Sequence, residues 1–296
     1  MSPVIDYCKS EEFASLLKLI DTEFVFSKNR LRSLAERFPA VYSPNNLANI
    51  YVARCNGVLA ASVTVRKFIW HATGRIWRGA MVGMVFTCPA YRKRGIGSAM
   101  MQRIQQDLAS AGMDFAVLWT KIPQFYERLG WLSNDCSAFG EALPEIDKSS
   151  GVLIKPRHLS ENMYKLLDAI RHKKQIEFLE RVPSDYAAIP LPAETVDLLL
   201  SEKPEGYSIV GRTHTACYLY EAPGDPDFWE RLLPSLRYAY PKLYLNQQTG
   251  SPFQKWLCEN ASVKWEAQNL AMWLPLTKQA SCIGIGKWYI PYFDRI

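Results

Sequence analysis

The sequence has 296 residues, of which 48% are hydrophobic and 22% are charged. This length exceeds the roughly 150 residues of one average domain, and the composition excludes a disordered or low-complexity chain. The net charge of +6 suits nucleic acid or a pocket for an anionic cofactor, so charge alone excludes neither. We expect two globular domains.

Targeting and metal signals are missing from the sequence. The first residues lack the basic and apolar regions of a signal peptide, and no apolar run reaches the roughly 18 residues of a membrane span. The seven cysteines form no CxxC pair and no His/Cys grouping at metal-ligand spacing. We therefore expect a cytoplasmic protein with buried thiols, no membrane partner and no metal.

The first half begins with strands that follow one another along the chain. Residues 4–8 predict a strand, 13–24 a helix capped at Ser10, and 30–38 a short helix. Residues 50–55 and 58–69 flank Asn56-Gly57, which is typical of a hairpin turn, and 77–87 predict another strand. A meandering antiparallel sheet follows from this order.

The pattern then changes to alternating helices and strands. Residues 98–111 have helical spacing and end at Gly112, 115–119 predict a strand, and 123–128 predict a short helix that ends before Gly130. A looser stretch at 140–151 marks a domain boundary, which gives domains of residues 1–145 and 146–296.

The second half repeats this type of order. We expect helices at 158–179, 193–201, 227–238 and 253–260, and strands at 207–210, 216–220, 242–245, 263–267 and 270–274. The order resembles the latter part of the first half, so a degenerate duplication is expected from element order, without sequence identity.

A basic, glycine-bearing loop joins a strand to a helix in the first half. Gly95 and Gly97 let main-chain N–H groups approach one anion closely, and the helix that starts there adds its positive dipole end. The predicted anion-binding residues are Arg92, Lys93, Arg94, Gly95, Ile96, Gly97 and Ser98. A helix-capping basic turn is the alternative, but the strand before and the strand after the helix favour a pyrophosphate site.

Other phosphate motifs do not fit this loop. The GxxxxGK[ST] pattern is missing, and Gly95, Gly97 and Met100 do not complete GxGxxG. A pyrophosphate of the coenzyme A type is favoured over a nucleoside triphosphate.

Two strings resemble motifs of one superfamily. Residues 82–98, VGMVFTCPAYRKRGIGS, resemble motif A of the GNAT N-acetyltransferases, whose R/Q-x-x-G-x-G/A pattern is matched by Arg92, Gly95 and Gly97. Residues 125–131, FYERLGW, are similar to motif B of that superfamily. The resemblance implies the GNAT fold, a mixed, largely antiparallel α/β (α+β) sheet flanked by helices, over residues 1–145.

The same resemblance implies acetyl-CoA as donor. It implies that the thioester carbonyl is held by main-chain amides of Val85, Phe86 and Thr87, and that Tyr126 returns a proton to the leaving thiolate. A phenol with an ordinary pKa of about 10 is neutral at pH 7 and can donate that proton. The alternative for Tyr126 is an aromatic ring that only packs against the cofactor.

The general base is not visible in the sequence. Glu23, Glu36 and His71 are candidates by position, and each is also compatible with an ordinary surface residue. The acceptor amine must lose a proton, so a route for that proton is required.

The tandem order resembles the first two domains of the enhanced-intracellular-survival acetyltransferases, with the second GNAT-like domain degenerate. In that family the terminal carboxylate enters the first cleft as base. Here Asp294 or Ile296 could reach the acceptor, although a final strand packing on its own domain is favoured over this arrangement. The second half lacks R-x-x-G-x-G, so one catalytic centre is expected.

We therefore expect an N-acetyltransferase that acts on a primary amine of a small molecule or peptide. The alternative is a non-catalytic module that binds acyl-CoA or a protein partner. Nucleic-acid binding is disfavoured because no basic and aromatic residues interleave. The acceptor, the acyl group beyond acetyl and a homo-oligomeric assembly stay open.

Overall fold

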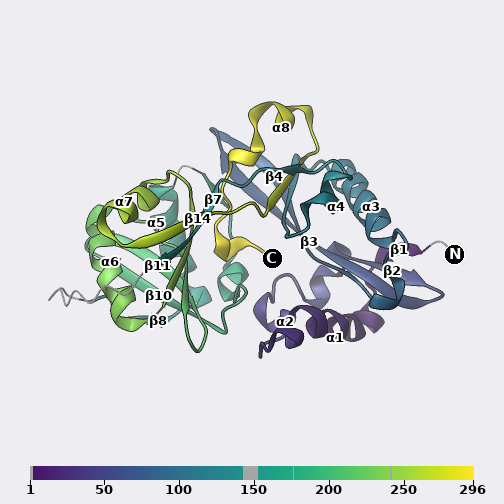
Figure 1. Cartoon of the computed structure of the whole chain (residues 1–296), viewed down its shortest axis with the longest axis horizontal. Coiled ribbons are helices and arrows are strands. Elements are labelled where there is room, and N and C mark those ends of the chain that lie inside the picture. The colour runs from purple at the N-terminus through teal and green to yellow at the C-terminus, as the bar shows by residue number, and fades with distance from the viewer. Residues whose placement is uncertain (1–2, 143–152, 176, 241) are drawn as a thin grey trace. The chain divides into compact units, whose positions relative to one another are not determined.

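The computed structural model describes residues 3–142, 153–175, 177–240 and 242–296 (Figure 1). It divides by internal contacts into two units. Unit 1 comprises Met1–Asp135, Leu270–Trp288 and Ile296, and unit 2 comprises Cys136–Asn269 and Tyr289–Arg295. Each unit has its own sheet and its own hydrophobic core.

The sheet of unit 1 runs in the order β1-β2-β3-β4-β5-β15-β6. All neighbouring pairs on this path are antiparallel except β4 and β5, which are parallel. The strands are β1 (Val4–Tyr7), β2 (Ile50–Cys55), β3 (Val58–Ala72), β4 (Arg75–Thr87), β5 (Phe115–Trp119), β6 (Leu132–Ser133) and β15 (Ala271–Pro275). Asn56 and Gly57 have φ of 52° and 79°, which confirms the predicted hairpin turn.

Helices cover both faces of this sheet (Figure 1). One face carries α1 (Phe13–Phe24) and α2 (Leu34–Arg37), and the other carries α3 (Ile96–Ser110) and α4 (Pro123–Glu127). Helix α8 (Lys278–Ile283) follows β15. The buried residues of α3 recur every three or four positions, so one stripe packs on the sheet: Met100, Met101, Ile104 and Leu108.

The sheet of unit 2 runs in the order β14-β7-β13-β12-β11-β10-β8. Its strands are β7 (Ser137–Ala142), β8 (Arg157–His158), β10 (Thr195–Glu202), β11 (Glu205–Arg212), β12 (Cys217–Glu221), β13 (Leu243–Gln248) and β14 (Val263–Ala267). Its helices are α5 (Tyr164–Lys174), α6 (Pro226–Ala239) and α7 (Pro252–Asn260), and a two-residue strand β9 (Phe178–Leu179) follows α5. Two mixed, largely antiparallel sheets with helices confirm the predicted fold class.

The two units are not contiguous in sequence. Strand β7 belongs to the sheet of unit 2, although the sequence places it in domain 1–145. Strand β15 pairs with β5 and β6 of unit 1, although the sequence places it in domain 146–296. Strand partners depend on long-range pairing, so chain order did not reveal the exchange. The predicted boundary at residue 145 lies outside the described residues.

Three predicted elements of the second half are wrong. Residues 195–202 form β10 and not a helix, because pairing with β11 and burial of Val196, Leu198 and Leu199 outweigh helical spacing. The helix predicted at 158–179 ends at Lys174. The last residues form a short 3-10 helix, Tyr292–Asp294, instead of a strand.

Among the described residues, no helix combines the length and apolar character needed to cross a membrane.

Candidate functional site

Strands β4 and β5 separate partway along their length. Their parallel pairing runs from Gly79 opposite Phe115 to Met81 opposite Val117 and ends there. Three residues after Met81, Met84 has a φ of 49°, and the register between β3 and β4 shifts at this point, so β4 carries a bulge. The sheet pairing therefore leaves the β5 side of the predicted residues Val85, Phe86 and Thr87 without a strand.

The basic loop lies between the short 3-10 helix Pro89–Tyr91, which follows β4, and α3. Lys93 and Gly95 both have left-handed φ, at 61° and 77°, and α3 begins at Ile96. The amide of Ala99 donates to the carbonyl of Gly95, so the amides of Ile96, Gly97 and Ser98 belong to the first helical turn, where no intrahelical acceptor exists. Space around Gly95 is open, because a Cβ there would have no heavy atom within 4 Å.

The arginines of this loop are held at its rim. Arg92 donates through Nε to the carbonyl of Thr87 at 2.9 Å and through Nη2 to Oε1 of Glu23 at 3.2 Å. The guanidinium of Arg94 lies over the ring of Tyr91, 5.6 Å from its centroid. Positive side chains and first-turn amides thus meet at one helix end, as an anion site requires.

Tyr126 lies next to this loop through α4. A Cβ on Gly97 would lie 3.5 Å from Phe125, the residue before Tyr126, and 3.8 Å from Oγ1 of Thr87. Tyr126 is 5% exposed and packs in the core with Met100 and Leu118. The structure thus places α4, which carries Tyr126, against the start of α3.

Burial raises the pKa of the Tyr126 phenol further above physiological pH. Desolvation raises the pKa of its phenol to about 12, so the group is neutral at physiological pH. No described residue is hydrogen-bonded to its hydroxyl. The ring of Trp131 meets Tyr126 edge to face at 6.2 Å between centroids, which fixes the ring orientation.

A cavity of about 920 Å³ opens on the face of the sheet that carries α1. Its walls come from α1, the start of β3 and the segment from Phe86 to Tyr91. Glu23 and Phe86 line it, as does Cys88, whose thiol pKa is raised by burial. The cavity thus shares Phe86 with the predicted donor site and reaches Arg92 through Glu23.

The structure separates the three candidate bases. Glu23 lines the cavity. Glu36 instead accepts hydrogen bonds from the amide and hydroxyl of Ser33 at the start of α2, which lower its pKa. His71 is nine residues along β3 from Ser62, the partner of Phe86, which is about 30 Å at strand spacing. His71 is therefore not part of this site.

The two tail residues named from the sequence have different surroundings. Asp294 is buried in unit 2, where its carboxylate is held by Arg181 at 2.8 Å. Ile296 belongs to unit 1 and lies against β4: a Cβ on Gly83 would be 2.9 Å from its main-chain oxygen. Gly83 follows the last β4–β5 pair by two residues.

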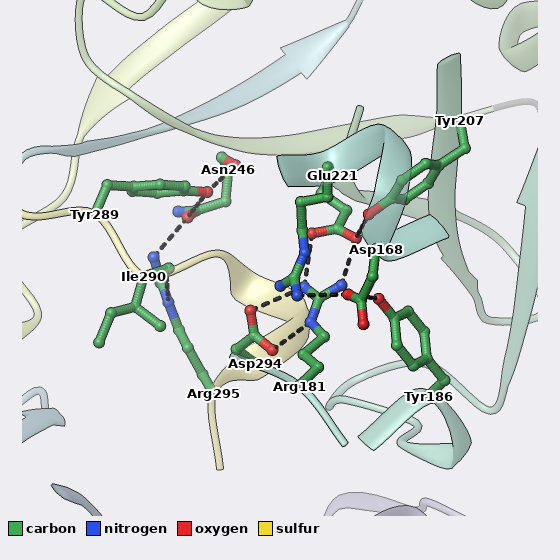
Figure 2. A network of polar contacts seen from close by, with 11 residues as sticks. Asp168, Arg181, Tyr186, Tyr207, Glu221, Asn246, Tyr289, Ile290, Asp294 and Arg295 are labelled. Atoms are coloured by element: carbon green, nitrogen blue, oxygen red, sulfur yellow. Dashed lines mark hydrogen bonds and ion pairs between the residues drawn. The ribbon is translucent and has the colours of Figure 1, made fainter. Parts of the chain in front are cut away.

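Sequence reasoning missed a buried ionic cluster in unit 2, which Figure 2 shows. Arg181 donates to both carboxylate oxygens of Glu221 at 2.7 Å and to both oxygens of Asp294 at 2.8 Å. Tyr207 donates to Glu221 at 2.8 Å. These partners lie up to 113 positions apart, so no local sequence pattern connects them.

The family comparison agrees with this geometry. Residues 4–133 match a family model described as an acetyltransferase (GNAT) domain. This part of the chain is a GNAT domain. A comparison with curated proteins finds no match.

Solved structures share the fold over nearly the whole chain. A GCN5-related N-acetyltransferase from Anabaena variabilis is 16% identical, with a TM-score of 0.74. The match covers 95% of this chain and 74% of that protein's chain. A probable N-acyltransferase from Enterococcus faecalis is 17% identical (TM-score 0.69; 95% and 74% covered). Eis1 from Mycobacterium abscessus is 16% identical (TM-score 0.64; 95% and 75% covered). These matches show a shared fold over nearly the whole chain, unit 2 included.

Proposed function

We propose that unit 1 transfers an acetyl group from acetyl-CoA to a primary amine. The observation that carries this proposal is the gap between β4 and β5, which lies between the anion-binding loop and the neutral phenol of Tyr126. The printed names of the relatives from Anabaena variabilis and Enterococcus faecalis, an N-acetyltransferase and a probable N-acyltransferase, support it.

In the donor site, main-chain amides bind both the pyrophosphate and the thioester of acetyl-CoA. The pyrophosphate binds the amides of Ile96, Gly97 and Ser98, and the arginines of the loop neutralise its charge. The pantetheine arm then lies along the β5 side of Val85, Phe86 and Thr87, where the amides bind its polar groups and the thioester carbonyl.

The reaction is direct attack on the thioester. The amine nitrogen forms a bond to the carbonyl carbon, the carbon–sulfur bond breaks, and the leaving thiolate takes a proton from Tyr126. A phenol with a pKa of about 12 is protonated before each turnover and regains its proton from solvent afterwards. The amine loses one proton to a base on the acceptor side.

Glu23 is one candidate to take that proton, because it lines the 920 Å³ cavity that we assign to the acceptor. Ile296 is a second candidate, because its main-chain oxygen lies over Gly83, two residues past the last β4–β5 pair. We assign unit 2 a structural role or a role in binding the acceptor. The segment after β12, Ala222-Pro223-Gly224-Asp225, is not a basic loop that would bind a second cofactor.

Transfer of labelled acetyl from acetyl-CoA to polyamines, aminoglycosides and peptides tests this function. The proposal expects labelled amide with at least one class and a large loss in Tyr126→Phe. Saturable binding of acetyl-CoA without any transfer would instead assign unit 1 to the non-catalytic acyl-CoA-binding class.

A further inference from the structure

Unit 2 contains a second gap between parallel strands. Pairing of β12 with β13 runs from Cys217 opposite Leu243 to Leu219 opposite Leu245 and ends there, although both strands continue. A cavity of about 510 Å³ lies at this point, lined by the ends of both strands and the beginnings of α6 and α7. The carboxyl ends of separating parallel strands are a common place for small ligands, and this volume falls in the range of ligand pockets.

Two side-chain amides in this cavity have polar atoms without partners. Gln247 is 8% exposed, and its Nε2 is buried with no hydrogen-bond partner among the described residues. Gln175 lines the same cavity, and its Oε1 is also buried without a described partner. Leaving a buried donor or acceptor unpaired costs about 1–3 kcal/mol, so a ligand or water that pairs with both is favoured.

The charged side chains that line the cavity disfavour a phosphate ligand, because Glu177 and Glu221 are acidic and Lys174 is paired with Asp225. The N-terminus of α6 is already capped by Asp225, whose carboxylate accepts the amide of Phe228 and binds Lys174 at 2.9 Å. Ser251 caps α7 in the same way through the amide of Gln254. Each of these caps accepts one amide of its helix, and Asp225 adds a negative charge at the start of α6, in contrast to the basic loop of unit 1.

The remaining walls combine aromatic rings with the polar side chains of Glu177 and Gln248. Tyr220, Trp229, Phe253 and Tyr289 line the cavity, and Trp229 is held by a hydrogen bond from its indole N–H to the carbonyl of Ala222 at 3.1 Å. The floor includes Glu221, which Arg181 neutralises. A ligand here meets aromatic rings, the polar groups of Glu177 and Gln248, the unpaired donor of Gln247 and the unpaired acceptor of Gln175.

We propose that the cavity between β12 and β13 of unit 2 binds a neutral, phosphate-free small molecule that carries a carboxamide next to an aromatic or apolar group. The amide carbonyl accepts from Nε2 of Gln247, and the amide N–H donates to Oε1 of Gln175. The apolar part packs against Trp229. This site is separate from the acyl-CoA site of unit 1 and does not depend on its function.

The probe is 3-phenylpropanamide, compared with its methyl ester, which keeps the carbonyl and loses the N–H donor. The full chain is labelled with 5-fluorotryptophan, and the ¹⁹F signal of Trp229 is assigned by its loss in Trp229→Phe. The proposal expects a saturable shift of this signal with the amide and binding at least about threefold weaker with the ester.

Substitution then locates the contacts. Gln247→Leu is expected to weaken amide binding by roughly threefold to tenfold, while Gln106→Leu, an exposed glutamine on α3, leaves it unchanged. Gln175→Leu serves the same purpose if the buried Gln247 variant does not fold. Equal binding of amide and ester, unchanged binding in both glutamine variants, or no saturable shift would overturn the proposal and leave the two amides paired with ordered water only.

Discussion

The main-chain oxygen of Ile296 lies where a side chain on Gly83 would begin: a Cβ at that position would be 2.9 Å from it. Gly83 has no side chain, so residue 296 can lie directly on β4 at the start of the β4–β5 gap. Residue 296 therefore lies against β4, the strand that carries the predicted thioester-binding residues.

Gly83→Ala should displace Ile296, because 2.9 Å is closer than a Cβ approaches a backbone oxygen. We expect kcat to fall by roughly tenfold, since the acceptor side loses a positioned group, with the Kd for CoA unchanged. Steady-state kinetics and calorimetry measure the two quantities. Ile296→Gly, which removes the side chain that lies against Gly83, is a second variant that should act in the same direction, and an unaltered kcat in both would remove Ile296 from the mechanism.

Tyr126→Phe removes one hydroxyl and keeps the ring that packs against Trp131. The expected result is a fall in kcat of about 10²- to 10⁴-fold with CoA affinity kept, because only proton donation is lost. Phe125→Tyr in the Tyr126→Phe background is a matched control that restores a phenol at the wrong position. Full activity of Tyr126→Phe would show that the phenol only packs.

The pKa of Tyr126 also predicts a pH dependence. Because burial raises this pKa from 10.0 to about 12, the folded state holds the proton more tightly than the unfolded state. The stabilisation is fully present below pH 10 and is lost as the pH rises through about 12. Chemical denaturation of wild type and Tyr126→Phe between pH 8 and pH 12 should show a steeper loss for wild type above pH 10.

Glu23→Gln should tighten CoA binding. Arg92 is held by Glu23 at 3.2 Å, and both side chains are about half exposed, at 49% and 45%, so this ion pair contributes at most about 1 kcal/mol. Loss of this ion pair frees Arg92 for the pyrophosphate, and we expect the Kd for CoA to fall by up to about fivefold at low salt. Glu11→Gln, an exposed carboxylate near the start of α1, is the control. Weaker CoA binding in Glu23→Gln would contradict this competition.

Arg181→Met should destabilise unit 2 strongly. It leaves the carboxylates of Glu221 and Asp294 buried without their cation, which costs about 3–5 kcal/mol. Asp294→Asn keeps a hydrogen-bonding group and should cost less. Urea unfolding of both variants checks the order, and equal stability of Arg181→Met and wild type would show that the cluster contributes nothing to stability.

Local signals in the sequence predicted local structure well. Asn56-Gly57 has the left-handed backbone of a hairpin turn, and Gly112 and Gly130 have φ of 68° and 87° where the helices end. The turn between β4 and α3 was predictable because all its parts lie within seven residues. Its binding of an anion and the role of Tyr126 stay predictions.

Features that depend on tertiary pairing were not predictable. The exchange of β7 and β15 follows from strand partners that are more than a hundred residues apart. The helical spacing of residues 195–202 was outweighed by the long pairing of β10 with β11. The cluster around Arg181 and the unpaired amide of Gln247 exist only after the chain has folded, so they leave no trace in residue spacing.

Calorimetric titration with CoA tests the central claim most directly. The account predicts saturable binding that weakens with salt and falls by at least about tenfold in the double variant Arg92→Ala, Arg94→Ala. Arg103→Ala, an exposed arginine farther along α3 that pairs with Asp107, should bind CoA as wild type does. No binding to wild type, or equal affinity in the loop variant and the Arg103 control, would contradict a CoA pyrophosphate site at the start of α3.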